Sequence, residues 1–133
     1  MHKDTRCPCN CGETYSSCCG RYHQGFDDPE VPLWPGTAET LMRSRFSAFA
    51  ANRPDYLLAT WFQDTRPAEL ELDTDMVWRS LEIVNTEAGG PFDSTGVVEF
   101  IARYKQGKKT GAQHEVSSFV RANGRWYYLD AAD

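Results

Sequence analysis

The stretch that decides the fold runs from Gly96 to Asp130 and reads GVVEFIARYKQGKKTGAQHEVSSFVRANGRWYYLD. Its first segment, 96–105, alternates apolar and polar residues, which predicts a β-strand with one buried face. A turn at 106–111 separates it from a second predicted strand, 112–121. Asn123-Gly124 then predicts a two-residue hairpin before a strand at 125–130, because a type I′ turn needs positive φ at both positions. With a further strand at 81–86, we expect an antiparallel meander.

The residues before this meander predict helices. Thr37 is a suitable N-cap, and apolar residues follow it at helical spacing up to Ala50. The break at 52–54 contains a proline that suits the first turn of a second, short helix with a bulky face over 56–62. A third short helix or turn is expected around 75–78. Helices followed by strands indicate an α+β domain with helices packed on one face of the sheet.

Charge and composition exclude several classes of function. The 133 residues carry a net charge of −5, which argues against broad nucleic-acid binding, since that requires a positive surface. We interpret the basic cluster of Arg103, Lys105, Lys108 and Lys109 as a solvated hairpin tip. No apolar run approaches the roughly 20 residues of a membrane span, and the N-terminus lacks a secretory signal, so we expect a cytoplasmic protein.

The cysteines form a tight cluster near the N-terminus. All five lie between positions 7 and 19, a spacing that favours a metal site over a disulfide framework in a chain without a signal. Four thiolates suit one structural zinc ion, and metal binding would supply folding free energy on the order of 10–16 kcal/mol. A redox-active thiol cluster, iron–sulfur ligation and a metal-free segment remain alternatives. His23 either replaces one sulfur ligand or is an exposed loop histidine.

Arg45 is the informative residue of the main domain. It lies within the apolar stripe of its predicted helix, with Arg43 at the edge of that stripe. A buried arginine is costly without an acidic partner or an anion, so Arg45 either meets a buried acid or faces a cavity. Glu115 is a candidate partner. Its neighbour His114 points to the opposite face of the strand, so the two cannot form an acid–base pair, and His114 is interpreted as satisfied or exposed.

Further residues complete the predicted interior. The two-residue hairpin sets Ser117 opposite Asp130, with Phe119 opposite Tyr128 and Arg121 opposite Trp126. An aromatic set, interpreted as core or as pocket lining, comprises Tyr56, Trp61, Trp78, Trp126 and Tyr128. Our pocket candidates are Arg45, Arg43, Tyr56, Trp61 and Glu115.

The segment Cys7-Pro-Cys9-Asn-Cys11-Gly-Glu-Thr-Tyr-Ser-Ser-Cys18-Cys19 resembles the SEC-C motif, in which Cys-x-Cys-x-Ser-Gly and five residues precede Cys-Cys or Cys-His. That motif is a zinc module of the preprotein translocase motor and of many small bacterial proteins. The resemblance implies zinc ligands at Cys7, Cys9, Cys18 and Cys19. Cys11 occupies the serine position, which leaves open whether it competes for the metal.

The phrases at 41–49, 55–61 and 124–130 resemble the YchJ-like family of bacterial proteins. The resemblance implies a SEC-C knuckle over 1–25, a linker over 26–36, and a domain over 37–133 similar to nuclear transport factor 2. Such a domain is a cone of curved antiparallel sheet and helices with an internal pocket. Many relatives have a second cysteine knuckle, whereas all five cysteines of residues 1–133 lie between positions 7 and 19, and many have a histidine where this chain has Phe62.

Two classes of function follow. The first is a binding or adaptor module that meets a protein partner through the zinc knuckle or holds a small ligand in the pocket. The second is an enzyme acting on a small molecule inside the cone. The chain contains no nucleophile–base constellation, phosphate loop or catalytic metal triad, so no catalytic residue is predicted and the binding module is favoured. A thiol or metal sensor using Cys11 is a third hypothesis.

Overall fold

The computed structural model describes residues 4–30 and 32–131. The ends of the two predicted domains (1–3 and 132–133) and Val31 of the predicted linker lie outside the described residues. In chain order the elements are a 3-10 turn η1 (Tyr15–Ser17), helices α1 (Cys19–Asp27), α2 (Ala38–Ala50) and α3 (Pro54–Ala59), and strands β1 (Met76–Ala88), β2 (Thr95–Gln106), β3 (Lys109–Ala122) and β4 (Arg125–Ala131).

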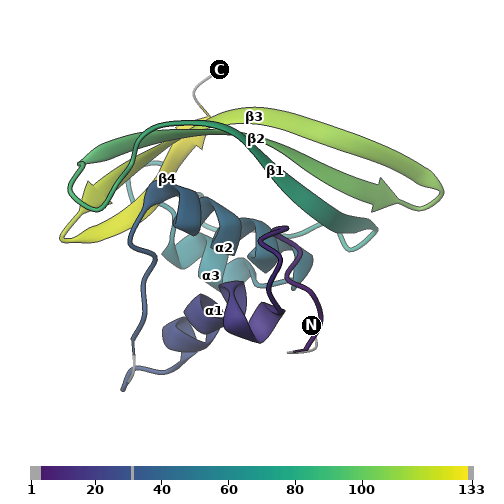
Figure 1. Ribbon diagram of the computed structural model, residues 1–133, viewed down its shortest axis with the longest axis horizontal. Helices are drawn as coiled ribbons and strands as arrows, with labels where there is room; N and C mark the ends of the chain where they lie inside the picture. The colour runs from purple at the N-terminus through teal and green to yellow at the C-terminus, as the bar shows by residue number, and fades with distance from the viewer. Residues whose placement is uncertain (1–3, 31, 132–133) are drawn as a thin grey trace.

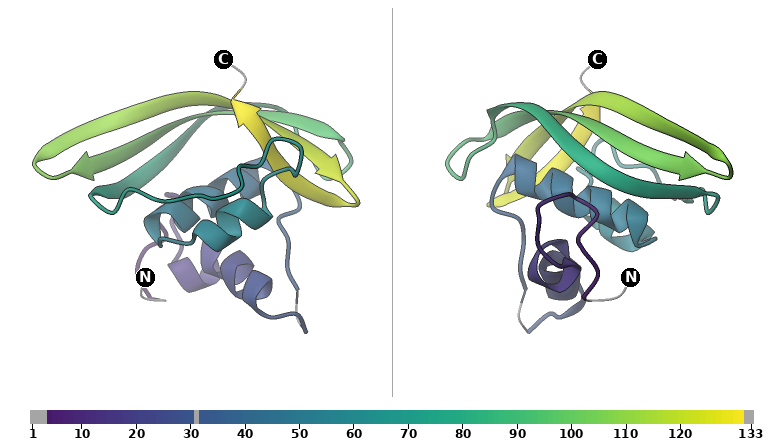
Figure 2. Two further views of the ribbon diagram at one scale, coloured as in Figure 1. Left: turned by 180° about the vertical axis from the view of Figure 1, so that it is seen from behind. Right: turned by 45° about the vertical axis from the view of Figure 1, so that its right-hand side comes forward.

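Across the described residues, the strands form one antiparallel sheet in the order β1-β2-β3-β4. The sheet curves over the helices, with α2 and α3 beneath its concave face and α1 in a further layer below them (Figure 1 and Figure 2). The predicted α+β class, with helices on one face of a curved sheet, is confirmed. Within the described ranges, no helix combines the length and the apolar character that crossing a bilayer requires.

The predicted helix or turn around 75–78 is correct only at Asp75, which lies in a turn, and wrong for the following residues, because β1 begins at Met76. Trp78 pairs with Tyr104 of β2, so this strand begins five residues before the predicted Leu81. Its long partner β2 extends to Gln106 and provides hydrogen-bonding groups that short-range patterns do not reveal. The apolar pair Val77-Trp78 also favours a pleated surface over a helix.

The predicted register of the last hairpin is correct near its turn and wrong further away. Phe119 pairs with Tyr128 and Arg121 with Trp126, as expected. A register shift between Ser118 and Phe119 then pairs Ser117 with Ala131 instead of Asp130. An extra residue in one strand displaces all later pairings, and the sequence carries no strong signal for it.

Helix α2 begins where the sequence predicts. The Thr37 side chain accepts a hydrogen bond from the Thr40 backbone N–H at 3.1 Å, which caps the helix. The start of α2 lies against the loop between β1 and β2, since the Ala38 N–H donates to the Gly89 carbonyl at 2.9 Å. A Cβ at Gly96 would lie 2.6 Å from the Gly89 Cα, so this contact requires glycine. The helix is thereby held beneath the sheet.

The cysteine segment packs directly on the main domain. Cys7, Cys9 and Cys19 belong to the same core cluster as Leu41 and Phe46. Helix α1 is an addition that the sequence reading lacked, and it runs to Asp27, past the predicted end of the knuckle. The following connector lies against β4, where the Trp34 indole N–H donates to the Trp126 carbonyl at 2.8 Å.

Candidate metal centre and pocket

The structure brings the four predicted zinc ligands together. One loop presents Cys7 and Cys9, and the junction of η1 and α1 presents Cys18 and Cys19. Their sulfur atoms all lie within 4.8 Å of one another. A loop with positive φ at Asn10 and Gly12 folds the chain back, and the Cys7 N–H donates to the Glu13 carbonyl at 2.9 Å. Cys7, Cys9 and Cys19 are buried, and Cys18 is half-buried.

The spacing of these sulfurs fits a tetrahedral zinc site. Zinc–thiolate bonds of about 2.3 Å put the sulfurs of a tetrahedron about 3.8 Å apart. The Cys9–Cys18 and Cys18–Cys19 sulfur distances are 3.6 and 3.9 Å. The donor set and its geometry therefore suit one tetrahedral divalent ion.

The thiols of the cluster alter one another's ionisation, and hydrogen bonds with Cys19 and Cys9 lower the pKa of Cys7. Hydrogen bonds with Cys7 and Cys9, together with burial, raise the pKa of the Cys19 thiol. Burial and the contact with Cys11 raise the pKa of Cys18. Thiols that resist joint ionisation become thiolates when they coordinate a divalent ion, because its charge dominates the site.

The other two candidates for this site take different places. The exposed Cys11 sulfur lies 2.8 Å from the Cys18 sulfur, at the outer edge of the cluster. His23 is neither a loop residue nor part of the sulfur group: it lies in α1 and is 2% exposed. Its Nε2 donates to the Ser44 carbonyl at 2.9 Å, so Nδ1 is the nitrogen that accepts from the Tyr15 hydroxyl. His23 thus joins α1 to α2.

Arg43, a pocket candidate, instead supports the cysteine loop. Its guanidinium donates to the Glu39 carboxylate at 3.1 Å and to the Cys9 carbonyl at 2.8 Å. It does not line the cavity described next. Two residues, a rotation of about 200° around the helix axis, separate it from Arg45, so its side chain points toward the knuckle instead of the sheet.

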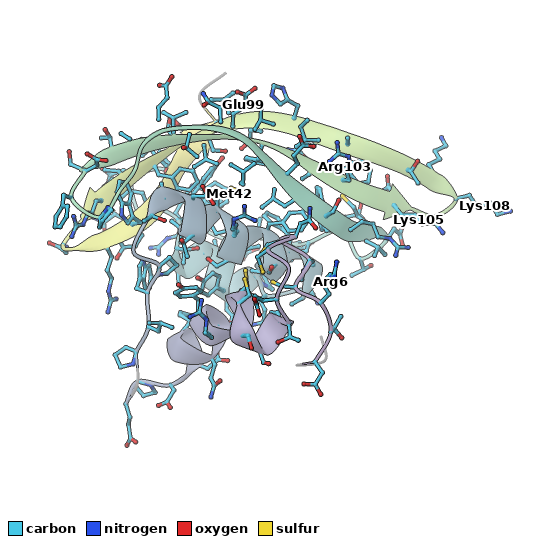
Figure 3. The ribbon with its side chains drawn as sticks, in the orientation of Figure 1. Arg6, Met42, Glu99, Arg103, Lys105 and Lys108 are labelled. Atoms are coloured by element: carbon cyan, nitrogen blue, oxygen red, sulfur yellow. The ribbon has the colours of Figure 1, made fainter. Side chains whose placement is uncertain are left out.

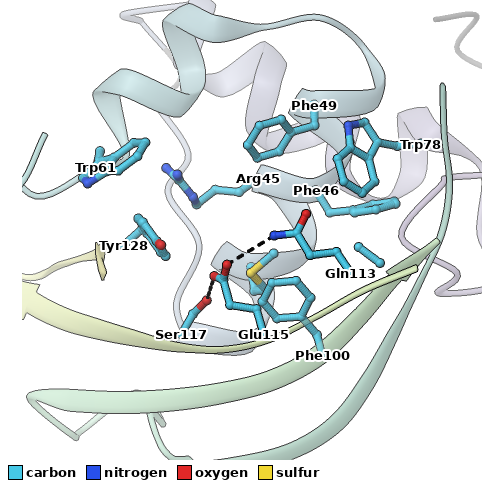
Figure 4. Close-up of a pocket in the computed structure, with 12 residues that line it drawn as sticks. Arg45, Phe46, Phe49, Trp61, Trp78, Phe100, Gln113, Glu115, Ser117 and Tyr128 are labelled. Atoms are coloured by element: carbon cyan, nitrogen blue, oxygen red, sulfur yellow. Dashed lines mark hydrogen bonds between the residues drawn. The ribbon is translucent and has the colours of Figure 1, made fainter. Parts of the chain in front are cut away.

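A cavity of about 220 Å³ lies between α2 and the concave face of the sheet (Figure 4). One water needs only about 10–15 Å³, so this space admits a small molecule. The lining comes from α2, the segment after α3 and all four strands, and comprises Met42, Arg45, Phe46, Phe49, Trp61, Trp78, Phe100, Ala102, Gln113, Glu115, Ser117 and Tyr128.

Arg45 occupies one end of this cavity and is 3% exposed. Its Nη1 donates to the Leu57 carbonyl at 2.8 Å and to the Thr60 hydroxyl at 2.6 Å. The guanidinium carbon lies 5.3 Å from the Trp61 ring centre and 4.6 Å from that of Tyr128. Burial lowers the pKa of Arg45 to about 10, which leaves it charged at neutral pH.

The predicted ion pair between Arg45 and Glu115 is wrong. Within residues 4–30 and 32–131, Arg45 makes no ion pair. Glu115 lines the same cavity from β3 and accepts hydrogen bonds from the Ser117 hydroxyl and, at 3.4 Å, from the Gln113 amide (Figure 4). The two charged groups line one cavity without direct contact. This matches the other alternative from the sequence, in which Arg45 faces a cavity. His114 points to the convex face, as predicted, and pairs there with Glu99 at 2.6 Å.

Two other aromatic candidates lie away from the cavity. Tyr56 is buried in a second core cluster, and its hydroxyl donates to Ser44 Oγ at 2.8 Å. Trp126 is core. Gln113 was not predicted, and Ser117 was placed in the interior without being named a pocket candidate, although their even spacing from Glu115 puts all three on one face of a strand.

The basic cluster lies on the hairpin of β2 and β3, away from both sites. Figure 3 shows Arg103, Lys105 and Lys108 along this hairpin. All four residues are exposed, and Arg103 pairs with Glu82 at 3.0 Å. This matches a solvated hairpin tip.

Comparisons with known proteins agree with this architecture. Residues 37–131 match the family model described as "YchJ, middle NTF2-like domain". A UPF0225 protein of Corynebacterium efficiens is 54% identical over 94% of this chain and 91% of its own length, and one of Streptomyces coelicolor is 47% identical over 93% and 92%.

Two solved structures are also similar. The solution structure of a SEC-C motif containing protein from Rhodopseudomonas palustris has 30% identity and a TM-score of 0.76, over 94% of this chain and 95% of that one. The crystal structure of a sec-c motif containing protein from Psychrobacter arcticus has 29% identity and a TM-score of 0.77, over 98% and 84%.

Proposed function

From the premise that the chain belongs to the YchJ-like family of UPF0225 proteins, we propose that it is a zinc-stabilised module that binds a small ligand in its nuclear transport factor 2-like domain. The observation that carries the proposal is Arg45, a buried charge that faces a cavity and has no ionic partner among the described residues. Buried charges are usually paired, so a cavity beside one is suited to a polar ligand.

In this proposal the zinc ion is structural and is held by Cys7, Cys9, Cys18 and Cys19. Four sulfur ligands leave no open position for water, so the ion's role is to fix the fold. Reduced thiols of this kind suit the cytoplasm, where we place the protein.

Metal analysis tests the zinc site. Purified wild-type protein should contain one zinc per chain, and Cys9→Ser should lose it because a buried sulfur ligand is removed. Cys11→Ser is the matched control and should retain the metal, since Cys11 lies outside the group of four. Full zinc in Cys9→Ser, or its loss in Cys11→Ser, would contradict the assigned ligand set.

A fragment screen tests the pocket. In NMR spectra, fragments that bind should shift the indole signals of Trp61 and Trp78, which line the cavity. Gln113→Trp should abolish these shifts by filling the exposed rim, whereas Ala112→Trp on the opposite face of β3 should not. A library in which no compound shifts either indole would refute ligand binding.

Enzymatic turnover is the alternative for the same cavity. Glu115 is the carboxylate that lines it, and its hydrogen bonds orient it. In this alternative Ser117, whose hydroxyl donates to Glu115, would be the nucleophile, but Ser117 is fully buried, so binding is the better-supported function. Binding of a protein partner at the knuckle stays a prediction. In the described knuckle Cys11 is exposed, whereas Cys7, Cys9 and Cys19 are buried and unavailable to a partner.

A further inference from the structure

We infer that the cavity takes a free amino acid with an apolar side chain, bound as its zwitterion. The inference rests on the proposed ligand-binding function and names its chemical class. Three features of the lining carry it: a fixed cation, a fixed carboxylate, and an apolar wall.

The cationic end is Arg45. One of its three nitrogens, Nη1, is held by Leu57 and Thr60. Nε and Nη2 make no hydrogen bond to the described residues. They are not fully buried either, because among the described residues the side-chain nitrogens that are both unpaired and fully buried belong to Trp61 and Trp126. These two arginine donors therefore keep contact with the cavity. A carboxylate matches them, because a guanidinium presents adjacent donors in a fixed fork.

Arg45 is also held in place before any ligand arrives. Trp61 and Tyr128 flank its guanidinium (Figure 4). Trp61 is fixed in turn by backbone pairing, since the Phe62 N–H donates to the Tyr128 carbonyl and the Tyr128 N–H to the Thr60 carbonyl, both at 2.8 Å. A pre-positioned donor loses little freedom on binding, which favours recognition of a small ligand.

The anionic end is Glu115. Ser117 and Gln113 donate to its two oxygens, one to each, and orient the carboxylate at the cavity wall. Each carboxylate oxygen has more than one acceptor position, so both retain capacity for a further donor. An ammonium group supplies three such donors and a full positive charge.

Charge balance selects a zwitterion over a simple ion. Arg45 and Glu115 have opposite charges and line one cavity with no direct contact. A simple anion would meet Arg45 favourably and Glu115 unfavourably, and a simple cation would do the reverse. A molecule that carries both a carboxylate and an ammonium group matches both charges of the lining.

The remaining wall is apolar and aromatic. It includes Met42, Phe46, Phe49, Trp78 and Phe100. Phe46 and Phe49 each contact the Trp78 ring, at centroid distances of 5.9 and 6.0 Å. This wall suits an apolar side chain, and an aromatic one in particular.

Three matched compounds test the inference by isothermal titration of the zinc-loaded protein. L-phenylalanine has both charged groups, 3-phenylpropionate lacks the ammonium, and 2-phenylethylamine lacks the carboxylate. We expect L-phenylalanine to bind at least tenfold more tightly than either of the others. Glu115→Gln keeps the shape of the side chain and should remove the preference for L-phenylalanine over 3-phenylpropionate. Glu99→Gln, on the convex face, should keep it.

The possible outcomes distinguish the zwitterion inference from the proposed function, which is ligand binding in the cavity. Equal binding of all three compounds would overturn the zwitterion and leave ligand binding intact. The zwitterion inference would also be overturned, with ligand binding intact, if none of the three compounds bound while members of the fragment library did. Failure of both the compounds and the library would overturn ligand binding itself. The wild-type comparison decides the matter even where Glu115→Gln does not fold, which its melting temperature would reveal.

Discussion

Replacing His23 with alanine should lower the free energy of unfolding by about 2.5–4.5 kcal/mol. The imidazole is 2% exposed and makes two hydrogen bonds, to Ser44 and Tyr15. Losing them and leaving a partly buried hydroxyl unpaired costs about 2–3 kcal/mol. The ring also lies against Tyr56 and Tyr15, at centroid distances of 4.6 and 5.5 Å. Loss of these contacts, together with the cavity that alanine leaves, should cost about a further 0.5–1.5 kcal/mol.

His114→Ala is the matched control for this experiment. The His114 side chain is 53% exposed, and its ion pair with Glu99 should contribute about 0–1 kcal/mol. Urea unfolding of zinc-loaded protein, followed by tryptophan fluorescence, measures both variants under the same conditions. If His23→Ala were no more destabilising than His114→Ala, the description of α1 as packed through His23 onto α2 would be refuted.

Three further outcomes are expected. Burial lowers the pKa of His23, so below about pH 6.5 the unfolded chain binds more protons than the folded chain. As the pH decreases, the free energy of unfolding of the wild type should therefore drop relative to that of His23→Ala, by up to about 1.4 kcal/mol per pH unit. Urea titrations at pH 7.5 and 5.5 measure this difference. Gly96→Ala should cost about 1–3 kcal/mol, because its Cβ would meet Gly89 at 2.6 Å, whereas Gly36→Ala meets nothing within 4 Å and should leave the melting temperature unchanged or slightly higher. Thr37→Ala should lower the stability by about 1 kcal/mol in thermal unfolding, since the cap on Thr40 is lost; an unchanged value would mean that the cap contributes nothing.

Local patterns predicted much of the main domain. The alternation over 96–105 and the Asn123-Gly124 turn depend on neighbours in the chain, so β2, β4 and the last hairpin were predictable. The start of β1 and the shift after Ser118 depend on partner strands, and no short-range signal reports them.

The candidate sites divide in a similar way. The clustering of four cysteines followed from motif spacing. Helical periodicity placed Arg45 inside the apolar stripe of its helix, but it left open whether Arg45 meets an acid or faces a cavity. Tyr56 and Arg43 belong to the same helical region, yet they point into a second core and toward the knuckle. Arg43 meets the cysteine loop at the Cys9 carbonyl, whereas Tyr56 packs against α1. Two glycines among the nine residues of α1 lower its helix propensity and hid it from sequence reasoning.

Helix α2 contributes to both sites from opposite sides of its axis. Toward the knuckle, Ser47 Oγ lies 3.4 Å from the Cys7 sulfur and Arg43 binds the Cys9 carbonyl. Toward the sheet, Arg45 and Phe49 line the cavity. If a bound metal and a bound ligand each stabilise this shared helix, occupancy of the two sites is thermodynamically linked. Metal that steadies the helix would strengthen ligand capture, and ligand would slow metal loss, with the same factor in both directions at equilibrium.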